Sequence, residues 1–183
     1  MRKIFLFMNV SLDGYFEGPG HDISSFHNDF EAFSADGSAD VDTLLFGHRT
    51  YDMMKFWSTP QGQELQPEIA QFMNEKHKVV ASHTTFDPGW QNVTVICDDV
   101  VGAVKQLKAQ PGKTIAMFGS NTLCVSLMEE GLIDEFQIMV NPVALGDGTS
   151  LFAGLSKQVP LTLTDSRAFK SGAVLLTYAP VSD

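Results

Sequence analysis

The sequence predicts an α/β fold with a mostly parallel sheet, helices on both faces and an antiparallel hairpin near the C-terminal end. Short apolar runs alternate with segments whose apolar residues recur at helical spacing, as in strand–helix–strand units. Glycine directly follows two of these runs, at Gly47 and Gly119, where a strand passes into a helix. After Glu135 the alternation gives way to strand-like runs without intervening helices, which indicates antiparallel pairing.

The first half of the chain begins with a strand at residues 4–10, which are nearly all apolar, as in a strand buried on both faces. A glycine-punctuated loop follows at residues 12–20. Asp22 is expected to cap a helix that carries Ile23, Phe26, Phe30 and Phe33 on one face. The next elements are a strand at 41–46, a helix with Tyr51, Met54 and Trp57 aligned, a polar loop at 58–66, and a short helix opened by Pro67 with Ile69, Phe72 and Met73 inward.

The second half supplies predicted strands at residues 78–81, 93–97 and 115–118. Asp98 or Asp99 caps the helix before the last of these, and Ser120 or Asn121 caps the helix after it. A long strand at 135–143 contains Pro142, which places that end at an edge or a bulge. Residues 161–164 and 173–178 form the hairpin that closes one edge of the sheet. No repeat or linker is visible, so residues 1–183 are expected to form a single domain.

Composition excludes several classes of function. The chain has 12 basic and 22 acidic residues, a net charge of −10, which argues against a broad nucleic-acid surface and against an anionic membrane partner. Its two cysteines show no metal-type or disulfide spacing, and Cys124 is expected to be a buried thiol. No apolar run reaches the ~18 residues of a membrane span, so we expect a cytoplasmic protein. No third ligand lines up with His21 and His27, so we expect no metal site.

The two strand–glycine–helix junctions are the candidate phosphate sites. Unpaired amides at a helix start attract anions, and glycine lets the backbone approach a ligand closely. Two junctions suggest a ligand with phosphates at two places, such as a dinucleotide. The candidates are Gly47, His48, Arg49 and Thr50 at the first junction, and Gly119, Ser120, Asn121 and Thr122 at the second.

Each candidate has a simpler alternative. Arg49 can bind phosphate in a bidentate manner, or it can be a surface residue paired with Asp52. The segment at Gly119 does not match the G-x-G-x-x-G fingerprint, so this glycine can instead serve strand–helix packing. Ser82 follows the strand at 78–81, where ligands gather in open sheets, or it simply ends that strand.

Five motifs, in register over nearly the whole chain, resemble one family. They are MNVSLDG at 8–14, LFGHRTY at 45–51, GS at 119–120, GLIDEF at 131–136 and NPVALGDG at 141–148. Together they resemble the reductase domain of bifunctional riboflavin biosynthesis proteins, and especially its stand-alone relatives with the dihydrofolate reductase fold. The resemblance implies that fold, NADPH as hydride donor, reduction of a phosphoribosylamino-pyrimidine or a related compound, and a homodimer.

The resemblance also implies where the cofactor lies. Its adenosine phosphate would sit near His48, Arg49, Thr50 and Ser82, and its pyrophosphate near residues 119–122. The nicotinamide would point toward Val10, Asp13 and Phe16. The zinc deaminase pattern of the bifunctional enzymes, H-x-E with P-C-x-x-C, is absent from this sequence, so the chain supplies only the reductive half. The relatives often carry two Arg where this chain has His48 and Arg49.

Asp13 is the candidate catalytic acid. A carboxylic acid with a raised pKa in a lid-like loop could hold the proton that assists hydride transfer to an imine-like carbon. The alternative is that Asp13 only shapes an Asp–Gly turn with Gly14. Phe26 is a candidate wall for a flat pyrimidine or pteridine ring, whereas His21 and His27 are interpreted as surface residues rather than ligands.

Three other functions stay open at this stage. Dihydrofolate reduction proper would need an acid that faces the ring from the first helix, and Asp22, Asp29 and Glu31 do not match that position in register. A binding module would keep the nucleotide site without redox chemistry. A flavin-binding protein would reveal itself by a yellow colour on purification.

Overall fold

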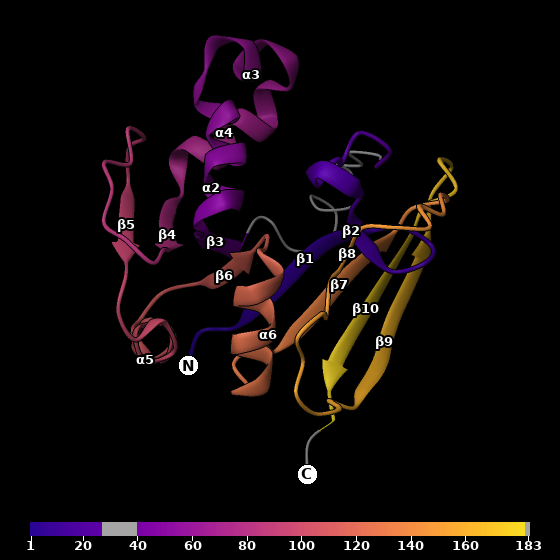
Figure 1. Cartoon of the computed structure of the whole chain (residues 1–183). Coiled ribbons are helices and arrows are strands. Elements are labelled where there is room, and N and C mark those ends of the chain that lie inside the picture. Colours follow the sequence, from indigo (N-terminus) through magenta and orange to yellow (C-terminus); the bar gives the residue numbers. More distant parts are fainter. Residues whose placement is uncertain (27–39, 182–183) are drawn as a thin grey trace.

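The computed structural model describes residues 1–26 and 40–181 of the chain. In this part of the chain one sheet has eight strands in the order β5-β4-β3-β6-β1-β7-β10-β9 (Figure 1). The parallel strands are β1 (Ile4–Val10), β3 (Val41–Gly47), β4 (His77–Ala81), β5 (Val93–Ile96), β6 (Thr114–Met117) and β7 (Glu135–Val140). β10 (Val174–Pro180) pairs antiparallel with β7, and β9 (Leu161–Ala168) pairs antiparallel with β10. The predicted mixed sheet with a C-terminal hairpin at one edge is confirmed.

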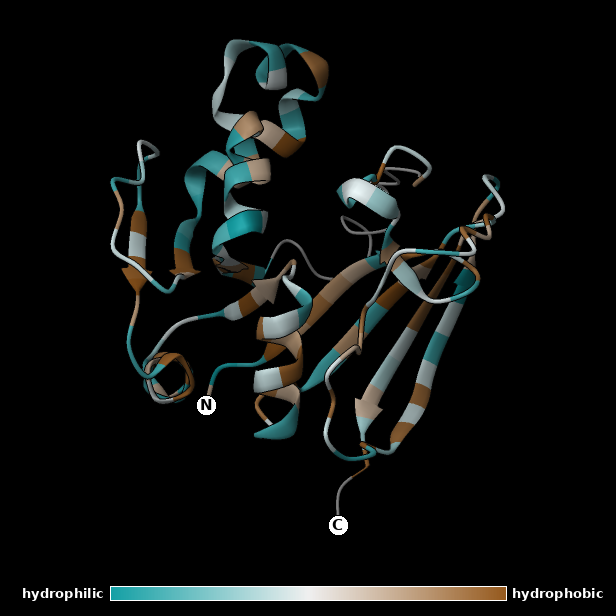
Figure 2. Cartoon of the chain, in the orientation of Figure 1, coloured by the Kyte–Doolittle hydropathy of each residue, from teal (hydrophilic) through white to brown (hydrophobic). Residues whose placement is uncertain are grey.

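β1 lies in the interior of the sheet and is buried on both faces, as its apolar sequence predicts. Ile4, Leu6 and Met8 belong to the hydrophobic cluster on one face, and Phe5 belongs to the cluster on the other face. Successive side chains of a strand point to opposite faces, so a strand covered on both sides is apolar at most positions, with Asn9 as the polar exception in β1. In Figure 2 apolar residues gather on the strands at the centre of the sheet.

Helices cover both faces of the sheet. On one face α2 (His48–Met54) contributes Tyr51, and α4 (Pro67–Glu75) contributes Ile69 and Met73. On the other face α5 (Val100–Ala109) contributes Val104, and α6 (Asn121–Glu129) contributes Leu127. No helix in the described ranges is long and apolar enough to cross a membrane.

Three local predictions differ from the structure. The expected polar loop at 58–66 is wrong, because η3 (Lys55–Ser58) is followed by α3 (Pro60–Leu65), whose first turn is capped by the Thr59 hydroxyl accepting from Gly62 N at 3.2 Å. β7 ends at Val140, before Pro142, and not at residue 143. The helix expected from Asp22 does not form over residues 22–26, which follow the short 3₁₀ turn η1 (Pro19–His21); the rest of the expected helix falls on residues 27–39, which lie outside the described residues.

A second, two-stranded sheet was not predicted. β2 (Tyr15–Glu17) pairs antiparallel with β8 (Thr149–Ser150), so the loop after β1 is held by a segment from the last third of the chain. The Cα partners are Tyr15 with Ser150 and Glu17 with Thr149. This pair lies next to the carboxyl end of β1 (Figure 1).

Two buried titratable side chains have structural roles. Lys78 is fully buried, and its Nζ donates to the carbonyls of Met73 (2.9 Å), Asn74 (3.3 Å) and Lys76 (2.7 Å) at the end of α4. Burial lowers the pKa of Lys78 from 10.5 to about 8. Cys124 is buried in α6 as predicted, and burial raises the pKa of its thiol to about 12.

Candidate active site

The two glycine junctions meet at the carboxyl edge of the sheet, because β3 and β6 are neighbouring parallel strands. Gly47 N donates to Gly119 O at 2.9 Å. A Cβ on Gly47 would stand 2.6 Å from Ser120 Oγ, which only a residue without a side chain avoids. The two predicted anion sites, residues 47–50 and 119–122, therefore form one continuous site, which we call the cradle.

The helices that start at this cradle have no side-chain caps. Gly47 precedes α2, and Ser120 stands at the N-cap of α6 as predicted but makes no side-chain cap hydrogen bond. By contrast, Thr59 caps α3, and Asp99 caps α5 by accepting from Gly102 N at 3.0 Å. An uncapped helix start keeps amide donors for a ligand, and the helix dipole favours an anion there.

Gly119 links the cradle to a neighbouring cavity. Its φ is +105°, a conformation that side chains rarely adopt, and a Cβ there would stand 3.3 Å from both Met8 Sδ and Thr50 Oγ1. Met8 and Thr50 also line the cavity. The backbone at Gly119 therefore borders both the cradle and the cavity.

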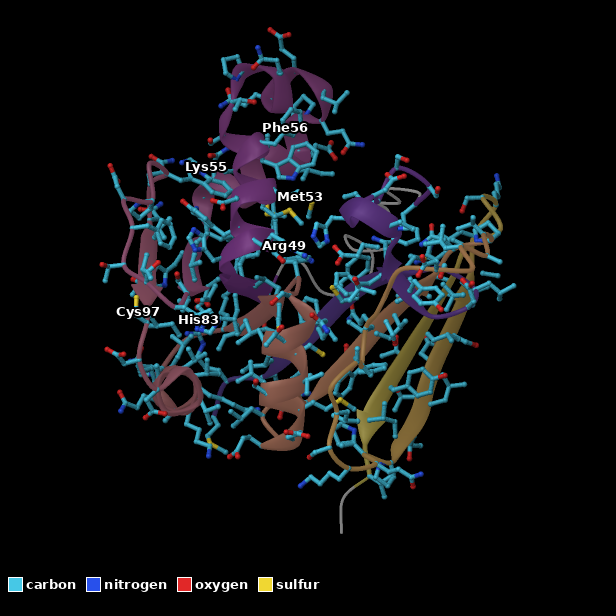
Figure 3. All side chains as sticks on the ribbon, in the orientation of Figure 1. Arg49, Met53, Lys55, Phe56, His83 and Cys97 are labelled. Carbon is cyan, nitrogen blue, oxygen red and sulfur yellow. The ribbon has the colours of Figure 1, made fainter. Side chains whose placement is uncertain are left out.

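The cavity has a volume of about 440 Å³, within the ~300–1,000 Å³ of small-molecule sites. It lies between β1, the β2–η1 segment and the helices α2 and α4. Its lining is mostly apolar, with Asn9, Glu17, His21, Arg49 and Thr50 as the polar exceptions; the apolar residues are Phe7, Met8, Phe16, Ile23, Phe26, Met53, Met54, Trp57, Ile69, Met73, Phe118 and Met139. Figure 3 shows Arg49 and Met53 on the flank of α2 that faces η1, with Lys55 on the opposite flank.

Arg49 contacts Glu17 and His21 in a cluster at this cavity, and its neighbour His48 contacts a different set of residues. Its Nη2 donates to Glu17 Oε2 at 2.7 Å, and its Nη1 lies 2.8 Å from His21 Nδ1. The Glu17 carboxylate also accepts from Thr149 Oγ1 at 2.8 Å, and only 5% of its side chain is exposed. Burial alone would raise the pKa of Glu17, but hydrogen bonds from His21, Thr149 and Arg49, with the charge of Arg49, lower it below its usual value. Glu17 therefore stays ionised and neutralises Arg49.

His21 Nδ1 is shared within this cluster. It lies 2.9 Å from Glu17 Oε1, where it must carry a proton, and 2.8 Å from Arg49 Nη1, where it must offer a lone pair. Only one of the two hydrogen bonds can form at a time, so Arg49 is fixed mainly by Glu17. The interpretation of His21 as a surface residue agrees with its side chain, 62% of which is exposed, and the structure adds its contacts with Glu17 and Arg49.

His48 and Ser82 form a second polar group beyond the cradle. The Ser82 hydroxyl donates to Thr84 O at 2.7 Å, so His48 Nδ1, 3.1 Å from Ser82 Oγ, supplies the proton for that contact. The His48 ring stacks on Phe86 with centroids 4.1 Å apart, and its Nε2 lies 3.6 Å from Asp52. The structure thus brings together His48 and Ser82, as predicted for one subsite, and directs Arg49 to other partners.

The raised pKa expected for Asp13 is wrong. Its two carboxylate oxygens accept from Leu145 N (3.0 Å) and Gly146 N (2.7 Å). Hydrogen bonds from the Ser11 side chain, then from Gly146 and Leu145, lower the pKa of Asp13 to about 2. An exposed carboxylate held by donors releases its proton more readily than a free one. This geometry favours the alternative in which Asp13 shapes a loop, here by joining two loops.

The other predicted site residues lie around the same edge. Phe16 is buried and lines the cavity, and Val10 is buried at the end of β1, where its carbonyl accepts from Asn141 N at 2.8 Å. Asn121 and Thr122 form the first turn of α6, with Asn121 Nδ2 donating to Ala153 O at 3.4 Å. Phe26 lines the cavity, as expected for a wall of a ring site.

Sequence reasoning missed Glu17, Asn9 and most of the methionines in the cavity. Asn9 carried a signal, because a polar residue stands in an otherwise apolar buried strand. Glu17 carried none, because its partners Arg49 and Thr149 are distant in the chain. In the described ranges no group of three or more His, Cys, Asp or Glu side chains could hold a metal ion.

Comparisons with known proteins agree with this architecture. The sequence model described as the RibD C-terminal domain matches residues 2–175. The uncharacterized protein YyaP of Bacillus subtilis (strain 168) is 30% identical over 178 residues, which cover 97% of this chain and 94% of that protein. The crystal structure of a putative riboflavin biosynthesis protein from Shewanella sp. PV-4 superposes with a TM-score of 0.76 at 21% identity, covering 98% and 99% of the two chains.

A dihydrofolate reductase from Enterococcus faecalis, solved as a complex with NADP(H), superposes with a TM-score of 0.67 at 13% identity and covers 98% of this chain and 97% of that one. The fold is therefore dihydrofolate reductase-like. The chain belongs to the RibD C-terminal domain family. This membership makes it a reductase-type domain of the oxidoreductase class, related to the reductases of riboflavin biosynthesis.

Proposed function

We propose that the protein is an NADPH-dependent reductase that transfers a hydride to an imine-like carbon of a pyrimidine- or pterin-type ring. The observation that carries the proposal is the common wall at Gly119, which separates an uncapped helix start from an apolar cavity of about 440 Å³. A dinucleotide whose phosphates bind at the helix start can present its reactive ring to a substrate in the cavity. The complex of the Enterococcus faecalis enzyme with NADP(H) supports this reading of the fold.

The residues present fit such a cofactor. The amides at the start of α6, together with Gly47 and Gly119, suit the pyrophosphate. His48 and Ser82 suit the extra phosphate of the adenosine end, because an imidazole N–H donates to phosphate oxygens and the Ser82 hydroxyl can turn from Thr84 O to do the same. Arg49 faces the cavity, so we assign it to the substrate side. When bound, NADPH supplies the hydride.

The chain's own contribution is orientation and the exclusion of water. Thr50 lies at the wall between cradle and cavity, Met8 and Phe16 line the cavity, and we expect the nicotinamide beside them and near Val10 at the end of β1. Asp13 ties the loop after β1 to the loop at Leu145, so its proposed role is to hold one side of the site closed. A dry, fixed site strengthens each polar contact to the reacting ring.

Titration with NADPH and with NADH tests the proposal. Ser82→Ala and His48→Ala should each weaken NADPH by ~10–100-fold, because a hydrogen bond to a charged group contributes ~1.5–3 kcal/mol. Binding of NADH should change much less in both variants. Ser166→Ala, on the exposed strand β9, is the matched control.

Steady-state oxidation of NADPH with candidate pyrimidine and pterin acceptors separates an enzyme from a binding module. Turnover of any such acceptor supports the reductase. Tight NADPH binding without turnover across the panel would refute the redox function and leave a nucleotide-binding module. The working state in this proposal is the cytoplasmic homodimer that the resemblance implies, and sedimentation of the purified protein tests the dimer.

A further inference from the structure

In the part of the chain that the structure describes, the cavity next to the cradle has no Lys or Arg side chain free of a carboxylate partner. Among the lining residues that the structure describes, Arg49 is the only Lys or Arg. Its guanidinium lies 2.7 Å from the ionised, buried Glu17 carboxylate, so the pair is close to neutral. Phosphate recognition normally depends on an uncompensated cation or on several free donors.

The neighbouring cations do not change this balance. Lys55 projects from the opposite flank of the η3–α2 segment (Figure 3), where its Nζ lies beside Gly89. The segment 27–39 follows the cavity residue Phe26 in the chain, and its sequence has Asp29, Glu31 and Asp36 but no Lys or Arg. That segment therefore supplies no guanidinium or ammonium group.

The rest of the cavity favours a flat and largely uncharged ligand. Phe16, Phe26, Trp57 and Phe118 supply aromatic faces, and several methionines among the lining residues supply an adaptable apolar surface. Asn9 and Thr50 are the uncharged polar lining residues, and they can bind ring nitrogens or exocyclic oxygens. Such a lining matches a heteroaromatic ring and not a sugar phosphate.

We propose, building on the reductase function above, that the substrate is an unphosphorylated heteroaromatic compound and that the Glu17–Arg49 pair excludes phosphorylated ones. The paired carboxylate cancels the attraction that Arg49 would exert on a phosphate, and it repels a second anion at the same place. The pair still leaves guanidinium edges that can donate to a neutral carbonyl. The structural relative from Thermotoga maritima, described as a 5-amino-6-(5-phosphoribosylamino)uracil reductase, acts on a phosphorylated compound by its name, so this chain would differ from it in substrate.

The experiment is calorimetric titration of the wild-type protein, saturated with NADP⁺, with a matched pair of probes. One probe is 5-amino-6-(5-phosphoribosylamino)uracil, and the other is the same compound after removal of the phosphate by a phosphatase. The unphosphorylated probe should bind at least tenfold more tightly. Equal binding, or tighter binding of the phosphorylated probe, would overturn the proposal.

The variant Glu17→Gln tests the assigned mechanism. It removes the negative charge and keeps hydrogen-bonding atoms toward Arg49 and Thr149, so the preference for the unphosphorylated probe should shrink at least fivefold. Glu64→Gln, which removes one exposed negative charge on α3, should leave the preference unchanged. An undiminished preference in a folded Glu17→Gln protein would show that Glu17 does not set it. The wild-type comparison stands even where this variant fails to fold.

These outcomes are distinguishable from failure of the reductase function, because the titration measures binding without turnover. A protein that prefers the unphosphorylated probe but never oxidises NADPH would refute the reductase and leave the ligand class standing. A protein that turns over the phosphorylated probe faster at low concentration would support the reductase and refute the ligand class.

Discussion

Replacing Lys78 by Met should destabilise the protein by about 2–4 kcal/mol. The Lys78 ammonium donates to three carbonyls at the end of α4 and lies 4.6 Å from the centre of the Trp90 ring. Met keeps most of the apolar stem and removes the donor. The carbonyls of Met73 and Lys76 then lose a buried partner.

The magnitude follows from two opposing contributions. Hydrogen bonds from a charged group contribute ~1.5–3 kcal/mol each, so three such bonds contribute ~4.5–9 kcal/mol. Burial opposes them, since it lowers the pKa of Lys78 from 10.5 to about 8. One pKa unit corresponds to ~1.4 kcal/mol, which makes this cost ~3.5 kcal/mol. The difference spans ~1–5.5 kcal/mol, and the middle of that range, ~2–4 kcal/mol, corresponds to a fall in Tm of ~5–15 °C for a domain of this size.

The same pKa shift predicts a pH dependence. Because the pKa of Lys78 is lower in the folded state, the unfolded chain binds more protons between about pH 8 and 10.5. The titration of Lys78 should therefore increase the free energy of unfolding of the wild type as the pH rises through this window. Lys78→Met has no such titration, so the gap between wild type and variant should widen with pH.

Urea unfolding followed by circular dichroism at pH 7, 8, 9 and 10 measures both effects. Lys157→Met, at an exposed lysine, is the control for loss of a positive charge. A Lys78→Met protein as stable as the wild type at pH 7 would refute the role of the three carbonyl bonds. A constant gap from pH 8 to pH 10 would refute the lowered pKa.

Three further predictions concern Gly119, Asp13 and the buried thiol of Cys124. Gly119→Ala should lower the free energy of unfolding by ~1–3 kcal/mol and weaken NADPH binding, because a φ of +105° disfavours a side chain and a Cβ would stand 3.3 Å from Met8 and Thr50. Thermal unfolding measures the first effect and NADPH titration the second. An unchanged Tm would contradict the predicted strain. Asp13→Asn should leave the pH profile of kcat unchanged, and a shifted profile would restore an acid–base role for Asp13. The pKa of Asp13 is lowered to about 2, so its carboxylate stabilises the folded wild type above about pH 4, and this contribution is lost as the pH falls from 4 to 2. The variant should lack that pH-dependent contribution. Cys124 should resist iodoacetamide at pH 8 until the protein unfolds, because burial raises its pKa to about 12, and mass spectrometry of the native protein would expose any early labelling.

Patterns between neighbouring residues predicted most of the fold. The continuous apolar run of β1 and the Pro67 start of α4 are local signals, and both elements form where expected. α3 was missed although Thr59 followed by Pro60 is a typical helix start, with a capping hydroxyl and a proline at the first turn. That error came from reading polar residues as a loop.

The site was less predictable because its decisive contacts join distant parts of the chain. The glycine junctions follow from local sequence, but the pairing of Arg49 with Glu17 depends on where β2 lies, and β2 is held by β8. The lowered pKa of Asp13 has this reason only in part: its largest cause is a hydrogen bond from the nearby Ser11 side chain, and the next causes are the amides of Gly146 and Leu145, which are distant in the chain. A single sequence carries no local signal for such partners.

The interior position of β1 has a consequence for how the chain folds. Ile4 pairs with Ile115 and Phe5 with Glu135, so β1 has no strand partner until β6 and β7 are available. Closing such long loops slows folding, and an unpaired apolar strand invites aggregation while it waits. A chain emerging from the ribosome therefore exposes one of its most insoluble segments for most of its synthesis, which makes chaperone demand during expression a property of this topology.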